Sequence, residues 1–320
     1  MPEVRKIQYN QQHEPWALDC PQRIREHALS LACQAVKNAK KKFAITKSFQ
    51  MVSFKKKKDV RQSFGFDRQS LGGDYVFKQL KYKVNFYSTE KFDSELEGTR
   101  IIRENHRWFL IVPATTLIKI PDNQRNNIVA LDPGIKTFVT FYSEFNHGKI
   151  GSADFNRIFR LCLCLDKLIS KISKAKCKAK RRMRRAASRL RWKIKDLINE
   201  LHHQTANFLV KNFNVILLPT FETQQMSSKL NSKSARNMLS FAHFRFKQFL
   251  KFKAKEYNCK VLDVCEAYTS KTCSYCGEMQ EIGSKSILKC TNCGVKVDRD
   301  LNGARNIYLR ALAVTPFGLN

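Results

Sequence analysis

The amino-acid sequence predicts an α/β protein with a β-rich N-terminal part and a small cysteine module near its C-terminus. Three observations support this prediction. After about residue 126, short apolar runs alternate with long helical patterns, which indicates a parallel sheet. Before that point, segments rich in Phe, Tyr, Val and Ile alternate apolar with polar residues, as antiparallel strands do. Two CxxC pairs lie close together, which is typical of a metal-binding module.

The N-terminal part opens with an amphipathic helix predicted over residues 21–43, where apolar residues recur at helical spacing. An antiparallel sheet or small barrel with a basic outer face should follow, with strands within residues 49–58, 74–88 and 106–114. That face is either an ordinary half-solvated surface or a platform for phosphates on which Trp108 can stack. Residues 120–127 have the composition of a linker.

The C-terminal part starts with the apolar run Ile128–Leu131, which suits a strand that is buried on both faces. Asp132 ends this strand, and a Pro-Gly turn follows. The pattern then predicts a strand at Thr137–Tyr142, a long helical stretch at 156–211, a strand at Asn214–Leu218, a helix at 235–256, a strand at Lys260–Val264 and a short C-terminal helix.

The charge balance indicates a polyanionic partner. Lys and Arg number 59 against 27 Asp and Glu, so the formal net charge is +32. Solubility needs only a few charges, and nucleic acid is the partner that best fits a charge of this size. A membrane surface is the competing interpretation, but the sequence has no run of 18 apolar residues and no signal peptide at its start. We therefore expect an intracellular protein.

The basic residues are concentrated in one stretch. Residues 167–195 contain no acid, and 13 of the 25 residues from 171 to 195 are Lys or Arg. A solvated helix usually mixes charges to gain ion pairs, so this stretch should repel itself unless an anion lies along it. We interpret it as a helix pair that faces nucleic acid, with a flexible basic linker as the alternative. The residues expected to contact nucleic acid are Lys176, Lys178, Lys180, Arg181, Arg182, Arg184, Arg185, Arg189 and Arg191.

The cysteine module has the spacing C-x2-C, thirteen residues, C-x2-C, formed by Cys273, Cys276, Cys290 and Cys293. Two CxxC knuckles that face each other supply the four thiolates of a tetrahedral Zn²⁺ site, and the glycine after each pair suits a sharp turn. Four protein ligands leave no open position, so the zinc should be structural. Thiol redox chemistry is the competing interpretation. The other seven Cys are expected to be small buried hydrophobes.

Three motifs in one order resemble those of a known family. ALDPGIKTFVTFYS, YTSKTCSYCG and VDRDLNGARNI together are similar to the TnpB (transposase OrfB) family of insertion sequences, and to its eukaryotic and giant-virus relatives, called Fanzor. The resemblance covers about residues 22–312. It implies an RNase H-like (RuvC-type) nuclease domain with an inserted four-cysteine zinc ribbon, preceded by an N-terminal β-barrel-like domain with helices. It also implies similarity to type V CRISPR effectors.

The resemblance also implies a domain division and a set of partners. Residues 1–125 would recognise guide RNA and DNA, residues 126–268 and 297–320 would form the nuclease, and residues 269–296 would form the zinc ribbon. The expected cofactors are one structural Zn²⁺, two catalytic Mg²⁺ and a guide RNA from the mobile element. We expect DNA as the substrate, no membrane and no small-molecule substrate. The protein should act at DNA, in a nucleus or a cytoplasmic viral factory if its source is eukaryotic or viral, and should not be secreted.

Carried over to this chain, the first catalytic acid of the family matches Asp132 and the last matches Asp300, the second acid of DRDLN. Asp298 is then a neighbour whose expected role is to cap the C-terminal helix. In most TnpB proteins the strand at Asn214–Leu218 leads directly into a catalytic Glu, whereas Pro219 takes that place here.

Two glutamates are candidates for the second acid. Fanzor-like members resemble this chain in lacking the usual Glu, and they supply an acid from the next strand. Glu266 follows the strand at Lys260–Val264 and is the preferred candidate, with Glu222 as the alternative. Asp263 is a weaker rival, because alternation along the strand would turn it away.

Three functions remain open at the level of the sequence. The first is an RNA-guided, Mg²⁺-dependent DNA endonuclease that uses Asp132, Glu266 and Asp300. The second is a catalytically inactive relic that binds nucleic acid through its basic helices and zinc ribbon. The third is a transposase that joins DNA strands in recombination. A competent second acid distinguishes the first from the second.

Overall fold

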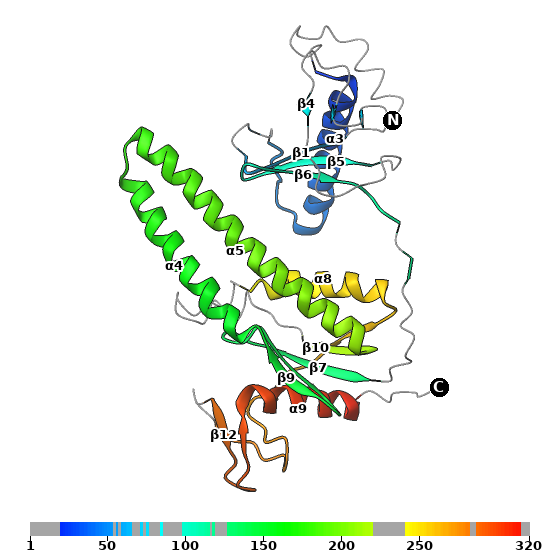
Figure 1. Ribbon diagram of the computed structural model, residues 1–320. Coiled ribbons are helices and arrows are strands. Elements are labelled where there is room, and N and C mark those ends of the chain that lie inside the picture. Colours follow the sequence, from blue (N-terminus) through cyan, green and yellow to red (C-terminus); the bar gives the residue numbers. More distant parts are fainter. Residues whose placement is uncertain are drawn as a thin grey trace. The chain divides into compact units, whose positions relative to one another are not determined.

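The computed structural model describes residues 20–53, 56, 59–65, 71–72, 75–76, 84–85, 98–115, 117–118, 127–219, 241–281 and 286–314. The chain divides into two compact units, Met1–Thr115 and Thr116–Asn320, and each is described by itself (Figure 1). Glu222 and the first residues of the helix predicted at 235–256 lie outside the described residues.

The first unit combines one long helix with two small antiparallel sheets. Helix α3 (Gln22–Thr46) confirms the predicted amphipathic helix. It lies so close to strand β1 that a Cβ added at Gly65 would be 2.9 Å from the ring of His27. The sheets have the orders β1-β5-β6 and β2-β3-β4. Their strands are β1 (Arg61–Gly65), β5 (Arg100–Glu104), β6 (Arg107–Ile111), β2 (Leu71–Gly72), β3 (Tyr75–Val76) and β4 (Val84–Asn85).

The strands of this unit were predicted only in part. β6 confirms the strand expected in residues 106–114, but the strand expected in 49–58 is wrong where that segment is described, because no strand begins before Arg61. β5 was not predicted, since its sequence RIIRE carries three charges. A tight turn of Asn105 and His106, both with positive φ, joins it to β6 and fixes the hairpin register.

The second unit is built on a five-stranded sheet in the order β11-β10-β7-β8-β9. β7, β10 and β11 run parallel, whereas β8 pairs antiparallel with both β7 and β9. The predicted parallel sheet is therefore confirmed, and its carboxyl ends gather at one edge. The strands are β7 (Ile128–Pro133), β8 (Val139–Ser143), β9 (His147–Ile150), β10 (Val215–Pro219) and β11 (Lys260–Val264).

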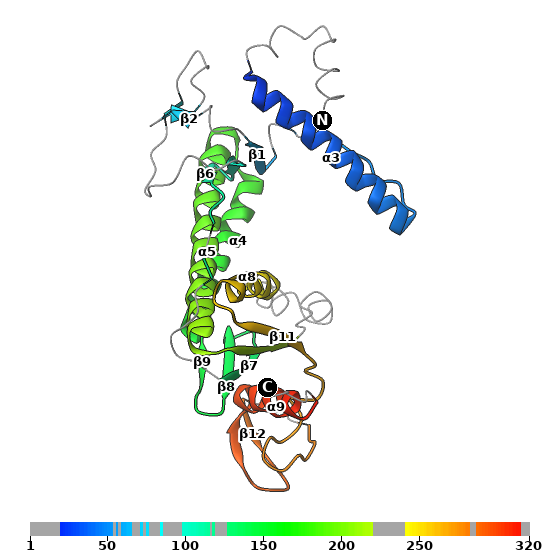
Figure 2. The same ribbon diagram turned by 90° about the vertical axis from the view of Figure 1, so that its right-hand side faces the viewer.

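Helices cover both faces of this sheet, as Figure 2 shows. Side chains alternate along β7: Val129 and Leu131 belong to one core with α4, α5 and α8, while Ala130 belongs to a second core under α9. Both faces of β7 are thus buried, as the apolar run predicted. The helices are α4 (Ser152–Lys174), α5 (Cys177–Asn212), α8 (His243–Glu256) and α9 (Arg299–Val314).

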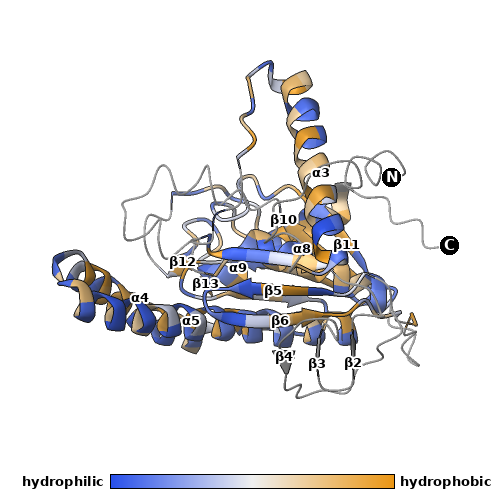
Figure 3. Ribbon diagram, turned by 90° about the horizontal axis from the view of Figure 1, so that it is seen from above, coloured by the Kyte–Doolittle hydropathy of each residue, from blue (hydrophilic) through white to orange (hydrophobic). Residues whose placement is uncertain are grey.

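The predicted basic stretch forms the end of a helical hairpin. α4 and α5 meet at Ala175 and Lys176, and only their sheet-proximal parts contribute to the main core, through residues such as Ile158 and Leu209. The far end of the hairpin projects from the sheet (Figure 2). Figure 3 colours much of α5 as hydrophilic. Among the helices that the structure describes, none combines the length and apolarity needed to cross a membrane.

Candidate functional site

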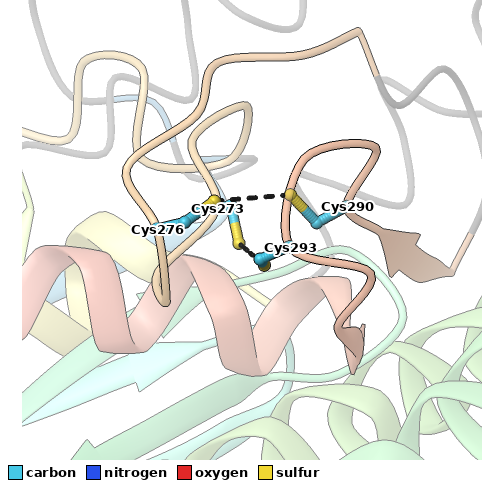
Figure 4. Close-up of side chains that lie close together, drawn as sticks. All are labelled: Cys273, Cys276, Cys290 and Cys293. Carbon is cyan, nitrogen blue, oxygen red and sulfur yellow. Dashed lines mark hydrogen bonds between the residues drawn. The ribbon is translucent and has the colours of Figure 1, made fainter.

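The four module cysteines converge on one point, as Figure 4 shows. Their Sγ atoms all lie within 4.8 Å of one another, with 3.5 Å between Cys276 and Cys290 and 3.8 Å between Cys273 and Cys293. Sulfurs at the corners of a tetrahedron with Zn–S bonds of about 2.3 Å are about 3.8 Å apart. The thiol positions therefore fit a structural zinc ion, and the predicted four-cysteine metal-binding cluster is confirmed.

Local backbone geometry builds this cluster. The N–H of Gly277 donates to the carbonyl of Cys273 (2.9 Å), and the N–H of Gly294 donates to the carbonyl of Cys290 (3.1 Å). Both glycines have positive φ, of 78° and 71°, which a side chain would disfavour. Strands β12 (Ile287–Lys289) and β13 (Lys296–Asp298) close the module on a small core around Leu288.

The other cysteines do not share one environment. Cys162 is buried, but Cys164, Cys177 and Cys265 are exposed, so the expected burial is wrong for these three.

Asp132 lies near the carboxyl end of β7 and faces the N-terminal part of α9. A Cβ added at Gly303 of that helix would be only 2.6 Å from Oδ2 of Asp132. The pKa of Asp132 is raised from 3.8 to about 8, first by burial and then by the charges of Asp300 and Glu266, while the charge of Arg299 acts in the opposite direction. Asp300 and Glu266 are therefore each close enough to Asp132 for their charges to act on it.

Glu266 lies two residues beyond β11, at the same edge of the sheet as Asp132. In the parallel register Pro219 of β10 is level with Val264, so both strands end just before this acid. Burial raises the pKa of Glu266. Asp263 faces the other way, since its carboxylate pairs with Lys247 (2.8 Å) and Lys251 (2.9 Å) of α8.

The two acids of DRDLN have different partners. Oδ1 of Asp298 accepts the N–H groups of Asp300 (3.1 Å) and Leu301 (3.2 Å), so Asp298 caps α9 as predicted. Asp300 is half exposed in the first turn and turns toward the edge that holds Asp132. Lys149 of β9 bridges the pair, with Nζ 2.8 Å from Asp298 and 3.5 Å from Asp300.

The donor set fits divalent cations such as Mg²⁺, which prefer carboxylate oxygens. A bound cation would relieve the repulsion that Asp300 and Glu266 each exert on a charged Asp132. The three carboxylates do not, however, meet as tightly as the thiols. In the described part of the chain, the cysteines form the only group of three or more His, Cys, Asp or Glu side chains whose ligand atoms lie within 4.8 Å of one another.

The basic hairpin presents its charges to solvent. Of the nine residues predicted to contact nucleic acid, eight are exposed and Lys180 is half-buried. None of the nine forms an ion pair with an acid among the described residues. In the first unit, Trp108 of β6 is 62% exposed, with Arg103 6.0 Å from its ring. Both features are available to a polyanion.

Sequence reasoning missed two residues of the acid edge, Lys149 and Gly303, and also Asn306, which binds the segment that follows Glu266. Lys149 was missed because β9 was not predicted. Gly303 and Asn306 lie within the quoted motif VDRDLNGARNI, where a helical projection from Asp300 would have placed Gly303 on the same face.

Comparisons with known proteins identify relatives of this chain. A family model described as Cas12f1-like, TNB domain, matches residues 243–307, which include Glu266, the four cysteines and Asp300. The protein named "Putative transposase A625R" of Paramecium bursaria Chlorella virus 1 is 31% identical, over 94% of this chain and 72% of its own length. The "Putative RNA-guided DNA endonuclease InsQ" of Escherichia coli is 22% identical, over 95% of this chain and 78% of its own.

A solved complex is also similar. The cryo-EM structure of a Cas12f1–sgRNA–target DNA complex is 20% identical, with a TM-score of 0.47 over 65% of this chain and 44% of that one. The conclusion on family rests on the sequence relatives, several of which are giant-virus proteins. The chain belongs to the TnpB-like transposase family.

Proposed function

We propose that this protein is an RNA-guided DNA endonuclease, in which Asp132, Glu266 and Asp300 hold two Mg²⁺ ions at the edge of an RNase H-like (RuvC-type) domain. Residues 126–268 and 297–320 form that domain, and the ribbon of residues 269–296 is inserted in it. Residues 1–125 recognise guide RNA and DNA. The sheet order and the antiparallel β8 support the RNase H-like assignment.

One observation carries the proposal. Three acids from β7, the end of β11 and the start of α9 lie close enough that the charges of Asp300 and Glu266 raise the pKa of Asp132. Repulsion between acids that the fold brings together destabilises the protein. Such an arrangement is therefore typical of a site that binds a cation. Two cations held in this way would activate a water molecule and stabilise the leaving oxygen of a phosphodiester.

The protein's own side chains have separable roles in this proposal. Asp132 is a residue of β7, lies against Gly303 of α9 and supplies a buried carboxylate. Glu266 takes the place of the glutamate that Pro219 excludes, because β11 ends beside β10. The exposed basic residues of the α4–α5 hairpin bind nucleic-acid phosphates, and Trp108 offers a surface on which a base can stack.

The proposal is tested by co-expressing the chain with the transcript that flanks its gene and purifying the complex. We expect Mg²⁺-dependent cleavage of a duplex that matches the bound RNA, and no cleavage of an unmatched duplex. Absence of cleavage with Mg²⁺ and with Mn²⁺, in a complex that retains RNA, contradicts the proposal. Strand joining in place of cleavage would favour a transposase.

One observation favours a second function, RNA or DNA binding without cleavage. The three carboxylates do not converge within 4.8 Å, and Lys149 already lies 3.5 Å from Asp300. In a binding protein of this kind, replacing hairpin residues with Gln would weaken nucleic-acid binding, whereas Asp132→Asn would change nothing. The salt dependence of binding should fall by about 0.7–0.9 in log–log slope for each phosphate that the variant no longer neutralises.

A further inference from the structure

The chain between β11 and the first CxxC pair is held in place by one face of α9. Asn306 is 8% exposed, and its Nδ2 amide donates to the carbonyls of Thr269 (2.8 Å) and Thr272 (2.6 Å). An amide NH₂ has two hydrogens, so one group satisfies both carbonyls. The bond to Thr269 is buried, so losing the donor would remove the Asn306 bond from that carbonyl, whereas the carbonyl of Thr272 would keep a second donor in Asn302.

Thr269, which Asn306 holds, in turn makes hydrogen bonds to the backbone of Glu266. Its backbone N–H (3.2 Å) and its Oγ1 hydroxyl (2.8 Å) both donate to the carbonyl of Glu266. A hydrogen-bonded chain therefore runs from Asn306 through Thr269 to the backbone of Glu266. The position of that backbone determines where the side chain of Glu266 lies, which is close enough to Asp132 for its charge to act there.

A second asparagine on α9 fixes the start of the ribbon itself. Asn302 is fully buried, accepts the N–H of Ser274 (2.9 Å) and donates to the carbonyl of Thr272 (2.8 Å). It is four residues from Asn306, so both lie on one face of the helix. The side-chain hydrogen bonds of Asn302 go to the two residues next to Cys273, whereas Asn306 also bonds to Thr269.

The same helix carries groups of the acid site. Asp300 lies in its first turn, and Gly303 contacts the carboxylate of Asp132. Helix α9 thus fixes one acid directly, touches a second and holds the segment that carries the third.

We propose that Asn306 is a positioning residue for Glu266, which it holds at the acid edge through Thr269. The inference rests on the proposed function, in which Glu266 is a cation ligand. The competing role for Asn306 is to dock the zinc ribbon with no effect on Glu266.

The test compares the full-length wild type with Asn306→Asp, which has almost the same shape but no donor. We expect backbone amide exchange in residues 267–274 to accelerate by about tenfold or more, with one zinc per chain retained, because the restraint on that segment is lost. Binding of Mn²⁺, followed by water proton relaxation, should weaken by about three- to tenfold. In a Glu266→Gln background the same change should weaken Mn²⁺ binding no further, because the two residues act as one unit.

Three further variants guard against misfolding and non-specific effects. Thr269→Val removes the hydroxyl with little change of shape and should reproduce a smaller part of both effects, while Thr269→Ser should behave like wild type. Asn212→Asp is the matched control, since its amide donates to the carbonyl of Phe208 (2.7 Å) on the exposed end of α5. It should leave exchange in 267–274 and Mn²⁺ binding unchanged.

Unchanged Mn²⁺ binding in Asn306→Asp and Thr269→Val, with faster exchange, would reduce Asn306 to a docking residue and overturn the inference. So would an equal loss of Mn²⁺ affinity in the Glu266→Gln background. If wild type binds no Mn²⁺ at these acids, the proposed function fails and Glu266 is no ligand. The exchange data then still show whether Asn306 orders the segment, so the two failures are distinguishable.

Discussion

The cysteine cluster and the acid edge are both candidate metal sites, but they are built in opposite ways. The four thiols come from residues 273–293, and two short knuckles aim them at one point. The three acids are spread over residues 132–300 and meet only because β7, β11 and α9 pack together. The local site is already convergent, whereas in the distributed site two acids repel a third, Asp132. Removing one ligand should therefore unfold the local site. The geometry of the distributed site depends instead on the packing of the surrounding fold.

The largest effect is expected in the local site. Cys290→Ser removes one of four ligands, so zinc should be lost and the ribbon should unfold, because binding of structural zinc contributes about 10 kcal/mol or more to folding. Metal analysis and amide exchange over residues 286–298 measure both outcomes. The control is Cys265→Ser, an exposed cysteine outside the cluster, which should retain zinc. Full zinc content in Cys290→Ser would show that the cluster is not a four-thiolate site.

Removing a carboxylate from the distributed site should abolish cleavage and leave the protein folded. Asp132→Asn removes a carboxylate that burial and two other acids disfavour, so the melting temperature should stay the same or rise. Cleavage of matched DNA should fall by about 100-fold or more, because the proposed cation site would lose one of its three carboxylates. A marked drop in melting temperature would mean that Asp132 serves the fold instead.

Acid should weaken the scaffold of the distributed site. His202 and His243 are buried and both stack on Phe138, with 5.2 Å between ring centroids in each pair, and His243 Nε2 lies 3.0 Å from the carbonyl of Gly134. Burial lowers the pKa of each histidine from 6.5 to about 4. In the unfolded chain both histidines are protonated below pH 6.5. In the folded chain they stay neutral until the pH falls to about 4.

Stability should therefore fall as the pH drops from 6.5 to 4, by at most about 3 kcal/mol for each histidine. Urea unfolding across this range, followed by the fluorescence of buried Trp192, measures the loss. His202→Asn with His243→Asn should flatten the pH dependence even though it lowers stability overall. An equally steep dependence in that variant would assign the effect to other groups.

The smallest expected effect is on stability, and it distinguishes the roles of Asp298 and Asp300. Asp298→Ala removes the cap of α9 and should cost about 1 kcal/mol of unfolding free energy, while Asp298→Asn should cost little, because Asn also caps helices. Asp298→Asn should cleave DNA like wild type, whereas Asp300→Asn should not. Equal loss of cleavage in both would give Asp298 a part in the acid site.

The difference between the sites also explains what the sequence predicts. The zinc site follows from spacing alone, because each knuckle is closed by hydrogen bonds within a few residues. Strand β11 and the face to which Asp263 points were also predictable, from an apolar run and its alternation. Lys149 was not, because β9 has the sequence HGKI, with one apolar side chain, and depends on β8 for its pairing.

The second acid marks the limit of prediction from the sequence. Strand order and the position of Pro219 favour Glu266, and the structure brings Glu266 close enough to affect Asp132. Glu222 lies outside the described residues, so the choice between the two glutamates stays a prediction. Asn306 escaped prediction for a related reason: its partners are backbone carbonyls of a segment more than thirty residues away.

The most direct test of the account is cleavage of RNA-matched DNA by Glu266→Gln, measured beside wild type, Glu222→Gln and Asp263→Asn in the purified RNA complex. The account predicts that wild type, Glu222→Gln and Asp263→Asn cleave in the presence of Mg²⁺ and that Glu266→Gln is slower by about 100-fold or more. Wild-type cleavage rates in Glu266→Gln, or a loss confined to Glu222→Gln, would contradict the assignment of Glu266 to the acid edge.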